Sequence, residues 1–209
     1  MAVTDGSSTR ETKRLQTRER LLGAAIAEFK RSGMADADVG AIVTAAGVAH
    51  GTFFFHFPTK EHVLLELERR EEERIVKQFN QFLKTRRGLS DVLEESVRLV
   101  LGLERRLGDV LFKDFLALHF SQTRPPLEDG NDHPVIVLVA QQIEQARDRG
   151  DIDPKIDPMN NAVFFLLGLY ALLVTTLEWP TRRALVDDYV SKTMRSMEPP
   201  STTRRARPA

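Results

Sequence analysis

The sequence predicts an all-α protein with a small N-terminal three-helix domain and a larger helical domain after it, about nine helices in total. Apolar residues recur at positions i, i+3, i+4 and i+7 through most of the chain, which is the spacing of an amphipathic helix. Glycine, proline and N-capping residues separate these runs, and no stretch shows a convincing strand. With 209 residues, of which 42% are hydrophobic, the chain is long enough to bury a substantial core.

The first helix is expected over residues 17–32, because Leu22, Ala25 and Phe29 share one face and Gly33 ends the run. The later helices have boundaries of the same kind, set by glycine, proline and capping residues. They are expected over residues 59–84, 90–106, 109–121, 134–149, 157–178 and 181–197.

A helix, a tight turn and a second, very short helix are predicted between Asp38 and Phe57. The carboxylate of Asp38 can cap the first helix, and Gly47 supplies the positive φ that ends it and turns the chain. Pro58 cannot continue the second helix. Helix, glycine turn and helix form the outline of a helix-turn-helix DNA reader.

Residues 17–67 resemble the N-terminal domain of TetR/AcrR-family transcriptional regulators. The resemblance rests on the runs TRERLLGAAIAEFKRSG, DVGAIVTAAGV and HGTFFFHFPTKEHVLLEL. The family's usual run of Gly-Thr, aromatic residues, Phe-Pro, Ser/Thr-Lys-Glu is matched by residues 51–52, 57–58 and 59–61. The resemblance implies a homodimeric repressor with an N-terminal DNA-binding domain and a C-terminal domain that binds a small effector.

At about 100° per residue, Phe53 and Phe57 share the inner face of the short helix, and Thr52 and His56 are expected to point outward into a groove. Residues at the start of such a helix can reach base edges, and Lys60 can meet a phosphate at the start of the next helix. The resemblance assigns contact with double-stranded operator DNA to these positions, which are His50, Gly51, Thr52, Phe54, His56 and Lys60.

Two residues depart from the family's pattern. Phe54 replaces a tyrosine whose hydroxyl reaches a phosphate, and Gly40 replaces an arginine or another polar residue. Phe54 and Phe55 are expected either to pack in the core or to stack on bases, and packing is favoured. A basic arm of Arg10, Lys13, Arg14, Arg18 and Arg20 lies near phosphates or is simply solvated, and the net charge of zero gives no overall basic signal.

Other function classes find little support in the sequence. There is no cysteine, no phosphate loop and no nucleophile motif. His50, His56 and His62 are six residues apart, about 240° around a helix, so they are not expected to share a metal. We therefore expect no cofactor and no metal; an enzyme and a helical dimer that does not bind DNA remain alternatives. The apolar run over residues 162–177 is shorter than a membrane span, so a cytoplasmic protein is expected.

The chain is expected to divide into four segments: a disordered arm over residues 1–13, a DNA-binding domain over 14–62, an effector and dimerisation domain over 63–198, and a disordered tail over 199–209. A largely hydrophobic effector site is expected among apolar side chains of the larger domain. These are Phe79, Leu93, Val97, Phe112, Phe115, Leu116, His119, Phe164, Phe165 and Tyr170. For His119 a satisfied, partly buried histidine is favoured over a ligand or a base. The homodimer interface is expected at Leu169, Leu173, Leu185, Tyr189 and Met194, because the helix over 157–178 is apolar nearly all round.

Overall fold

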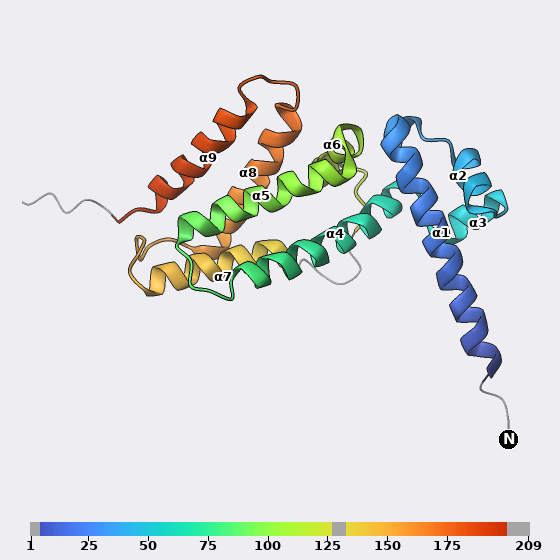
Figure 1. The fold of residues 1–209 in the computed structure, drawn as a ribbon, viewed down its shortest axis with the longest axis horizontal. Helices are drawn as coiled ribbons and strands as arrows, with labels where there is room; N and C mark the ends of the chain where they lie inside the picture. Colours follow the sequence, from blue (N-terminus) through green and yellow to red (C-terminus); the bar gives the residue numbers. More distant parts are fainter. Residues whose placement is uncertain (1–4, 127–132, 200–209) are drawn as a thin grey trace, which may run out of the picture. The chain divides into compact units, whose positions relative to one another are not determined.

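The computed structural model describes residues 5–126 and 133–199, and every regular element in these residues is helical (Figure 1). The predicted all-α fold is therefore confirmed. The helices are α1 (Asp5–Asp36), α2 (Val39–Ala46), α3 (His50–His56), α4 (Lys60–Phe82), α5 (Leu89–Leu107), α6 (Asp109–Ala117), the 3₁₀ turn η1 (Leu118–Phe120), α7 (Pro134–Asp148), α8 (Pro158–Thr175) and α9 (Arg182–Met197).

The chain forms two compact units. The first unit contains Met1–Glu71 and Leu103–Glu128, and the second contains Glu72–Gly102 and Asp129–Ala209. This division differs from the predicted boundary after residue 62, because the first three turns of α4 and all of α6 belong to the first unit. The predicted tail over 199–209 lies almost wholly outside the described residues.

In the first unit, α1 packs against α2 and α6. The helix begins at Asp5, so residues 5–13 are helical where a disordered arm was expected. Gly33 interrupts it with a φ of 78°, at the position where the sequence predicted its end. Just after this break the Met34 N–H donates to the Asp114 carboxylate at 2.6 Å, which ties the end of α1 to α6.

In the second unit, α8 packs against α7 and α9 and buries five side chains. By length and composition it is apolar enough to cross a membrane, as is the core helix of many folded domains. Leu169 and Leu173 are fully buried within the chain. They have no surface left for a partner, so their predicted place in the dimer interface is wrong.

The contact between α8 and α9 depends on Gly168 and Tyr189. The Tyr189 hydroxyl lies 3.0 Å from the Phe164 carbonyl and 2.9 Å from the Phe165 carbonyl, and it donates to them. Its ring stacks on the Phe165 ring with centroids 5.8 Å apart. A Cβ on Gly168 would lie 2.3 Å from the hydroxyl oxygen, so a larger residue there would displace the Tyr189 side chain. Tyr189 thus contributes mainly to contacts inside the chain.

Candidate nucleic-acid interface

The α2–α3 pair has the geometry of a helix-turn-helix, with the two helices bent by 95° across the turn. The Asp38 carboxylate accepts a hydrogen bond from the Gly40 N–H at 2.8 Å. Gly47 adopts the left-handed conformation, with φ 65° and ψ 44°, and the Val48 N–H donates to the Val43 carbonyl at 3.0 Å. The predicted cap at Asp38 and turn at Gly47 are confirmed.

The exposed face of α3 consists of His50, Gly51, Phe54 and Phe55. At about 100° per residue these four residues form one continuous arc of the helix. Phe55 is 73% exposed and Phe54 is 47% exposed. The favoured prediction that both rings pack in the core is therefore wrong for Phe55, and Phe54 keeps only part of its surface covered.

The opposite arc of α3 is buried and contains Phe53 and His56, followed by Phe57 at the end of the helix. The prediction that His56 points outward is therefore wrong, and Thr52 is half-buried. Burial lowers the pKa of His56, and the neighbouring charges of Arg18 and Arg14 lower it further. This side chain contributes to the packing of α3 rather than to its outer surface.

Arg18 of α1 holds the C-terminal end of α3. Its Nη1 donates to the His56 carbonyl at 2.5 Å, and its Nη2 donates to Glu66 of α4 at 3.2 Å. The guanidinium carbon also lies 4.3 Å from the centroid of the Phe57 ring. One side chain therefore fixes α3 against α1 and α4, a role that the sequence analysis did not find.

Lys60 occupies a different environment from the predicted one. Its ammonium nitrogen lies 2.9 Å from each of the carbonyl oxygens of Met34, Ala35 and Ala37, and it donates to all three. An ammonium group has three N–H donors, so these bonds use all of them. The predicted contact between Lys60 and a phosphate is therefore wrong for this conformation, and Lys60 caps the end of α1 instead.

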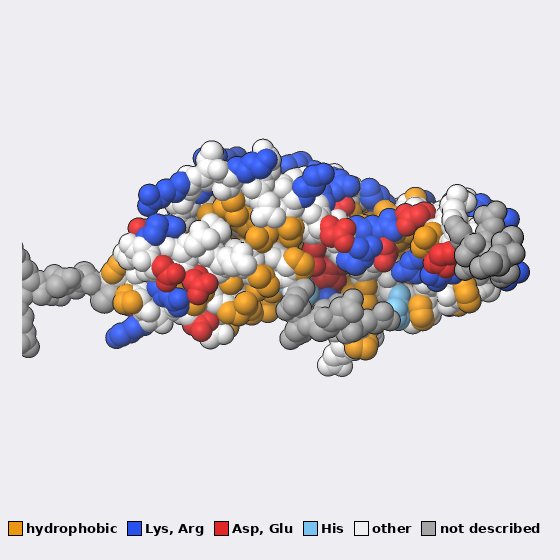
Figure 2. Space-filling model, turned by 90° about the horizontal axis from the view of Figure 1, so that it is seen from below, with side chains coloured by type: hydrophobic (Ala, Val, Ile, Leu, Met, Phe, Trp, Pro, Cys, Tyr) orange, Lys and Arg blue, Asp and Glu red, His pale blue; other side chains and the backbone are white. Residues whose placement is uncertain are grey.

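Arg20 is the cation beside the turn of the helix-turn-helix. Its Nη1 lies 3.9 Å from the position that a Cβ on Gly47 would occupy. Arg14 and Arg18 of the same helix are held by carboxylates, whereas no residue in the described part of the chain pairs with exposed Arg20. The zero net charge conceals such local differences: Figure 2 shows Lys and Arg side chains along one edge of the drawn face, while Asp and Glu lie among further Lys and Arg side chains elsewhere on it.

The predicted effector-site residues do not share one environment. Phe112, Phe115 and Leu116 are buried in the first unit, while Phe79, Leu93 and Phe165 are buried in the second, where Tyr170 is half-buried. Phe164 is 71% exposed, so its predicted place in an enclosed site is wrong. Val97 lines a groove of about 450 Å³ between α5 and α9, together with Leu101 and Val186.

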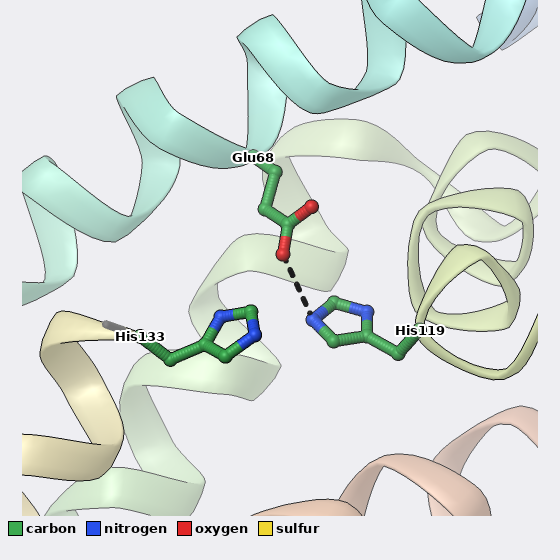
Figure 3. A group of neighbouring side chains, drawn as sticks. All are labelled: Glu68, His119 and His133. Carbon is green, nitrogen blue, oxygen red and sulfur yellow. Dashed lines mark ion pairs between the residues drawn. The ribbon is translucent and has the colours of Figure 1, made fainter. Parts of the chain in front are cut away.

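The remaining candidate, His119, belongs to a buried polar cluster (Figure 3). Its Nε2 lies 3.1 Å from Oε1 of Glu68, and Arg124 Nη1 lies 2.9 Å from the other carboxylate oxygen. Burial alone would raise the pKa of Glu68, but the hydrogen bonds and charges of His119 and Arg124 outweigh burial and lower it to about 2. The His119 side chain is therefore buried and bonds a carboxylate through Nε2.

Comparison with known proteins extends the result beyond the helix-turn-helix. Residues 21–67 match the family model described as "Bacterial regulatory proteins, tetR family". The chain is 25% identical over 165 residues to the HTH-type transcriptional regulator UidR of Escherichia coli (strain K12). The aligned residues cover 78% of this chain and 83% of UidR. It is 30% identical over 127 residues to an uncharacterized HTH-type transcriptional regulator of Mycobacterium tuberculosis (strain H37Rv), covering 61% and 59% of the two chains.

Solved structures share the fold over nearly the whole chain. RolR in complex with its ligand resorcinol superimposes with a TM-score of 0.68 at 18% identity, covering 95% of this chain and 98% of RolR. Thermus thermophilus FadR, a TetR-family repressor in complex with lauroyl-CoA, superimposes with a TM-score of 0.64 at 23% identity, covering 85% and 91%. At these identities the likeness concerns the fold.

The family model coincides with the helix-turn-helix and the helices that hold it, and the named relatives are regulators rather than enzymes. The protein is a DNA-binding transcriptional regulator of the TetR family.

Proposed function

We propose that the protein is a homodimeric repressor that binds double-stranded operator DNA through α3 and is released from it by a small, largely hydrophobic ligand. The observation that carries this proposal is the exposed arc of α3, in which His50, Gly51, Phe54 and Phe55 face outward while the opposite arc is buried. The protein acts in the cytoplasm, where its operator is.

Arg20 takes the phosphate-binding role that Lys60 does not fill. Its guanidinium lies beside the turn that leads into α3, and nothing in the described chain neutralises it. Lys13 is seven residues earlier, which places it on the same face of α1, and it is also exposed. Phosphate contacts of this kind set the orientation of the reader without specifying sequence.

The homodimer forms through the outer face of α8, with the half-buried residues Leu185 and Met194 of α9 completing the interface. Phe164 and Leu167, three residues apart on α8, are exposed apolar side chains of the second unit. Apolar surface of this kind is favourably buried against a second copy, and a two-fold axis makes such a face self-complementary. A dimer presents two α3 helices to two half-sites.

The ligand binds in the second unit, for which the α5–α9 groove offers both apolar and charged lining residues. Val97, Leu101 and Val186 supply apolar side chains, and Arg98 and Arg182 supply guanidinium groups. Proteins of the same fold bind ligands as different as resorcinol and lauroyl-CoA. In this proposal the response reaches α1 through α6, because the Asp114 carboxylate holds the Met34 N–H at the break in α1.

Duplex selection tests the proposal. The full-length chain is incubated with fragmented genomic DNA at low salt, and retained duplexes are tested by mobility shift for two chains per duplex. Arg20→Gln should reduce the slope of log K against log salt concentration by about one unit for each half-site. Lys113→Gln, the same charge change at an exposed position of α6, should leave the slope unchanged. Retention of no duplex would refute DNA binding.

In vitro transcription from a promoter that carries the selected duplex then separates repression from activation. Addition of resorcinol and of lauroyl-CoA in separate reactions tests release by the two ligand types. A repressor lowers transcript yield, and its ligand restores it. An increase in transcript on addition of the protein alone would contradict the repressor assignment while leaving DNA binding intact.

A further inference from the structure

The outward face of α3 offers aromatic carbon where a base-reading helix usually offers hydrogen-bond donors. Phe55 is the most exposed large hydrophobic side chain in the described residues, at 73%. Phe54 beside it is 47% exposed, although neighbouring Phe53 and Phe57 are completely buried. Of the outward residues, His50 alone has a side-chain polar atom. The surface is therefore shaped for an apolar target.

The Phe54 ring is held in a fixed orientation. It meets the His50 ring with centroids 5.7 Å apart, and it meets the Phe53 ring edge-on with centroids 5.3 Å apart. Because Phe53 is buried, it anchors Phe54 to the core. A ring held in this way loses little conformational freedom when it binds, which favours recognition by shape.

Gly51 lies between the two exposed rings on the same arc of the helix. It has ordinary helical geometry, since it is not among the glycines with positive φ. A Cβ at this position would meet nothing within 4 Å. Glycine weakens a helix relative to alanine, and no described residue lies close enough to require it here. A close approach of the backbone to something outside the chain would account for its presence.

We propose that Phe54 and Phe55 read thymine bases in the operator by packing against their 5-methyl groups. This inference rests on the proposed function and names the base that the reader selects. The thymine methyl is the apolar group that base edges present in the major groove, and phenylalanine is one of the side chains that contacts it. The missing Cβ at Gly51 lets the helix backbone come close enough for both rings to reach the base edges.

The test uses a duplex that the full-length chain selects from a pool of random sequences, prepared once with thymine and once with 2′-deoxyuridine. Uracil lacks only the methyl group. The unmodified protein should bind the uracil duplex about fourfold more weakly for each methyl contacted, since burial of one such group contributes a factor of this size. Phe55→Ala should bind the thymine duplex more weakly and should lose most of the discrimination, and Phe54→Ala should lose part of it.

Phe120→Ala is the matched control, because Phe120 is also half-exposed in the first unit but lies outside α3. This variant should keep the full discrimination, and thermal unfolding should show all variants folded. Equal affinity of the unmodified protein for the two duplexes would overturn the inference. So would unchanged discrimination in both phenylalanine variants, because the methyl groups would then act through DNA shape. Failure to select any duplex would instead refute the proposed function.

Discussion

Gly51 in α3 and Gly168 in α8 are both helical glycines beside an exposed phenylalanine, yet their surroundings differ. A Cβ on Gly168 would lie 2.3 Å from the Tyr189 hydroxyl and 3.0 Å from the ring carbon that bears it. A Cβ on Gly51 would meet nothing within 4 Å. Packing inside the chain explains Gly168 completely, and it does not explain Gly51.

The exposed phenylalanines alone do not distinguish the two regions, since Phe55 and Phe164 are 73% and 71% exposed. The glycines do. Around Gly168 the backbone is covered by Tyr189 of α9, whereas the neighbouring Phe164 side chain stays exposed and is left for another protein chain. Around Gly51 the backbone itself is open to solvent, which suits a partner that enters between the side chains. We expect Phe164 to bind protein and Phe55 to bind DNA.

The largest expected effect is on assembly. Phe164→Glu should convert the dimer to a monomer at micromolar concentration, because two carboxylates would face each other across the two-fold axis. Operator affinity should then fall by about two orders of magnitude, since each half-site is bound separately. Phe55→Glu should remain a dimer in sedimentation experiments while it loses DNA binding. A Phe164→Glu protein that sediments like the unmodified one would contradict the proposed interface.

Gly168→Ala should lower the free energy of unfolding by about 2 kcal/mol, because the new methyl displaces Tyr189 from a packed contact. The displaced hydroxyl also loses its bonds to the Phe164 and Phe165 carbonyls. Urea unfolding measures the change. In a Tyr189→Phe background the same substitution should cost less, since the closest clash is gone. Strictly additive effects of the two substitutions would show that the clash is not the cause.

Gly51→Ala should have the opposite effect on stability. It should raise the free energy of unfolding by up to about 1 kcal/mol through helix propensity while it weakens operator binding. Gly23→Ala is the matched control, because Gly23 lies in α1, is exposed and likewise has open space around its Cα. It should stabilise the protein and leave operator affinity unchanged. An affinity loss of the same size in both variants would remove the distinction between the two glycines.

The smallest expected effect concerns pH. Burial lowers the pKa of His56, so the folded state binds this proton less readily than the unfolded state. The free energy of unfolding should be at its plateau above the ordinary histidine pKa of about 6.5 and should decrease as the pH falls below it. His56→Gln should flatten this dependence in urea titrations between about pH 5 and 7. The Glu68 contribution is distinguishable, because its pKa of about 2 places its loss at more acidic pH.

The helix ends were predictable because their causes are local. Asp38, Gly47 and Asp157 act on backbone groups within a few residues, and the structure shows all three in the expected roles. The orientation of α3 was not predictable in the same way. The helix has seven residues, and helical spacing put Phe53 and Phe57 inside and His56 outside. The contact that holds its end comes from Arg18, which is 38 residues away in sequence.

The misplaced interface residues have a similar cause. A helix that is apolar nearly all round carries no polar residue to mark its outer face, so the sequence could not separate Leu169 and Leu173 from Phe164. The separation arises from the helices that pack on α8. The sequence also could not separate residues that line an effector site from residues of the core. A buried aromatic side chain has the same appearance in sequence whether it lines a cavity or fills a core.

Lys60 also limits which substitutions this protein can accept over evolution. Three carbonyls converge on one nitrogen, an arrangement that suits the three N–H bonds of an ammonium group. A guanidinium is planar and cannot direct its donors in the same way, so lysine and arginine are not equivalent at this position. A lineage that acquires arginine here must first rebuild the corner between α1 and α2. Among descendants of this chain, residue 60 should therefore change more slowly than Arg20, which has no such partners among the described residues.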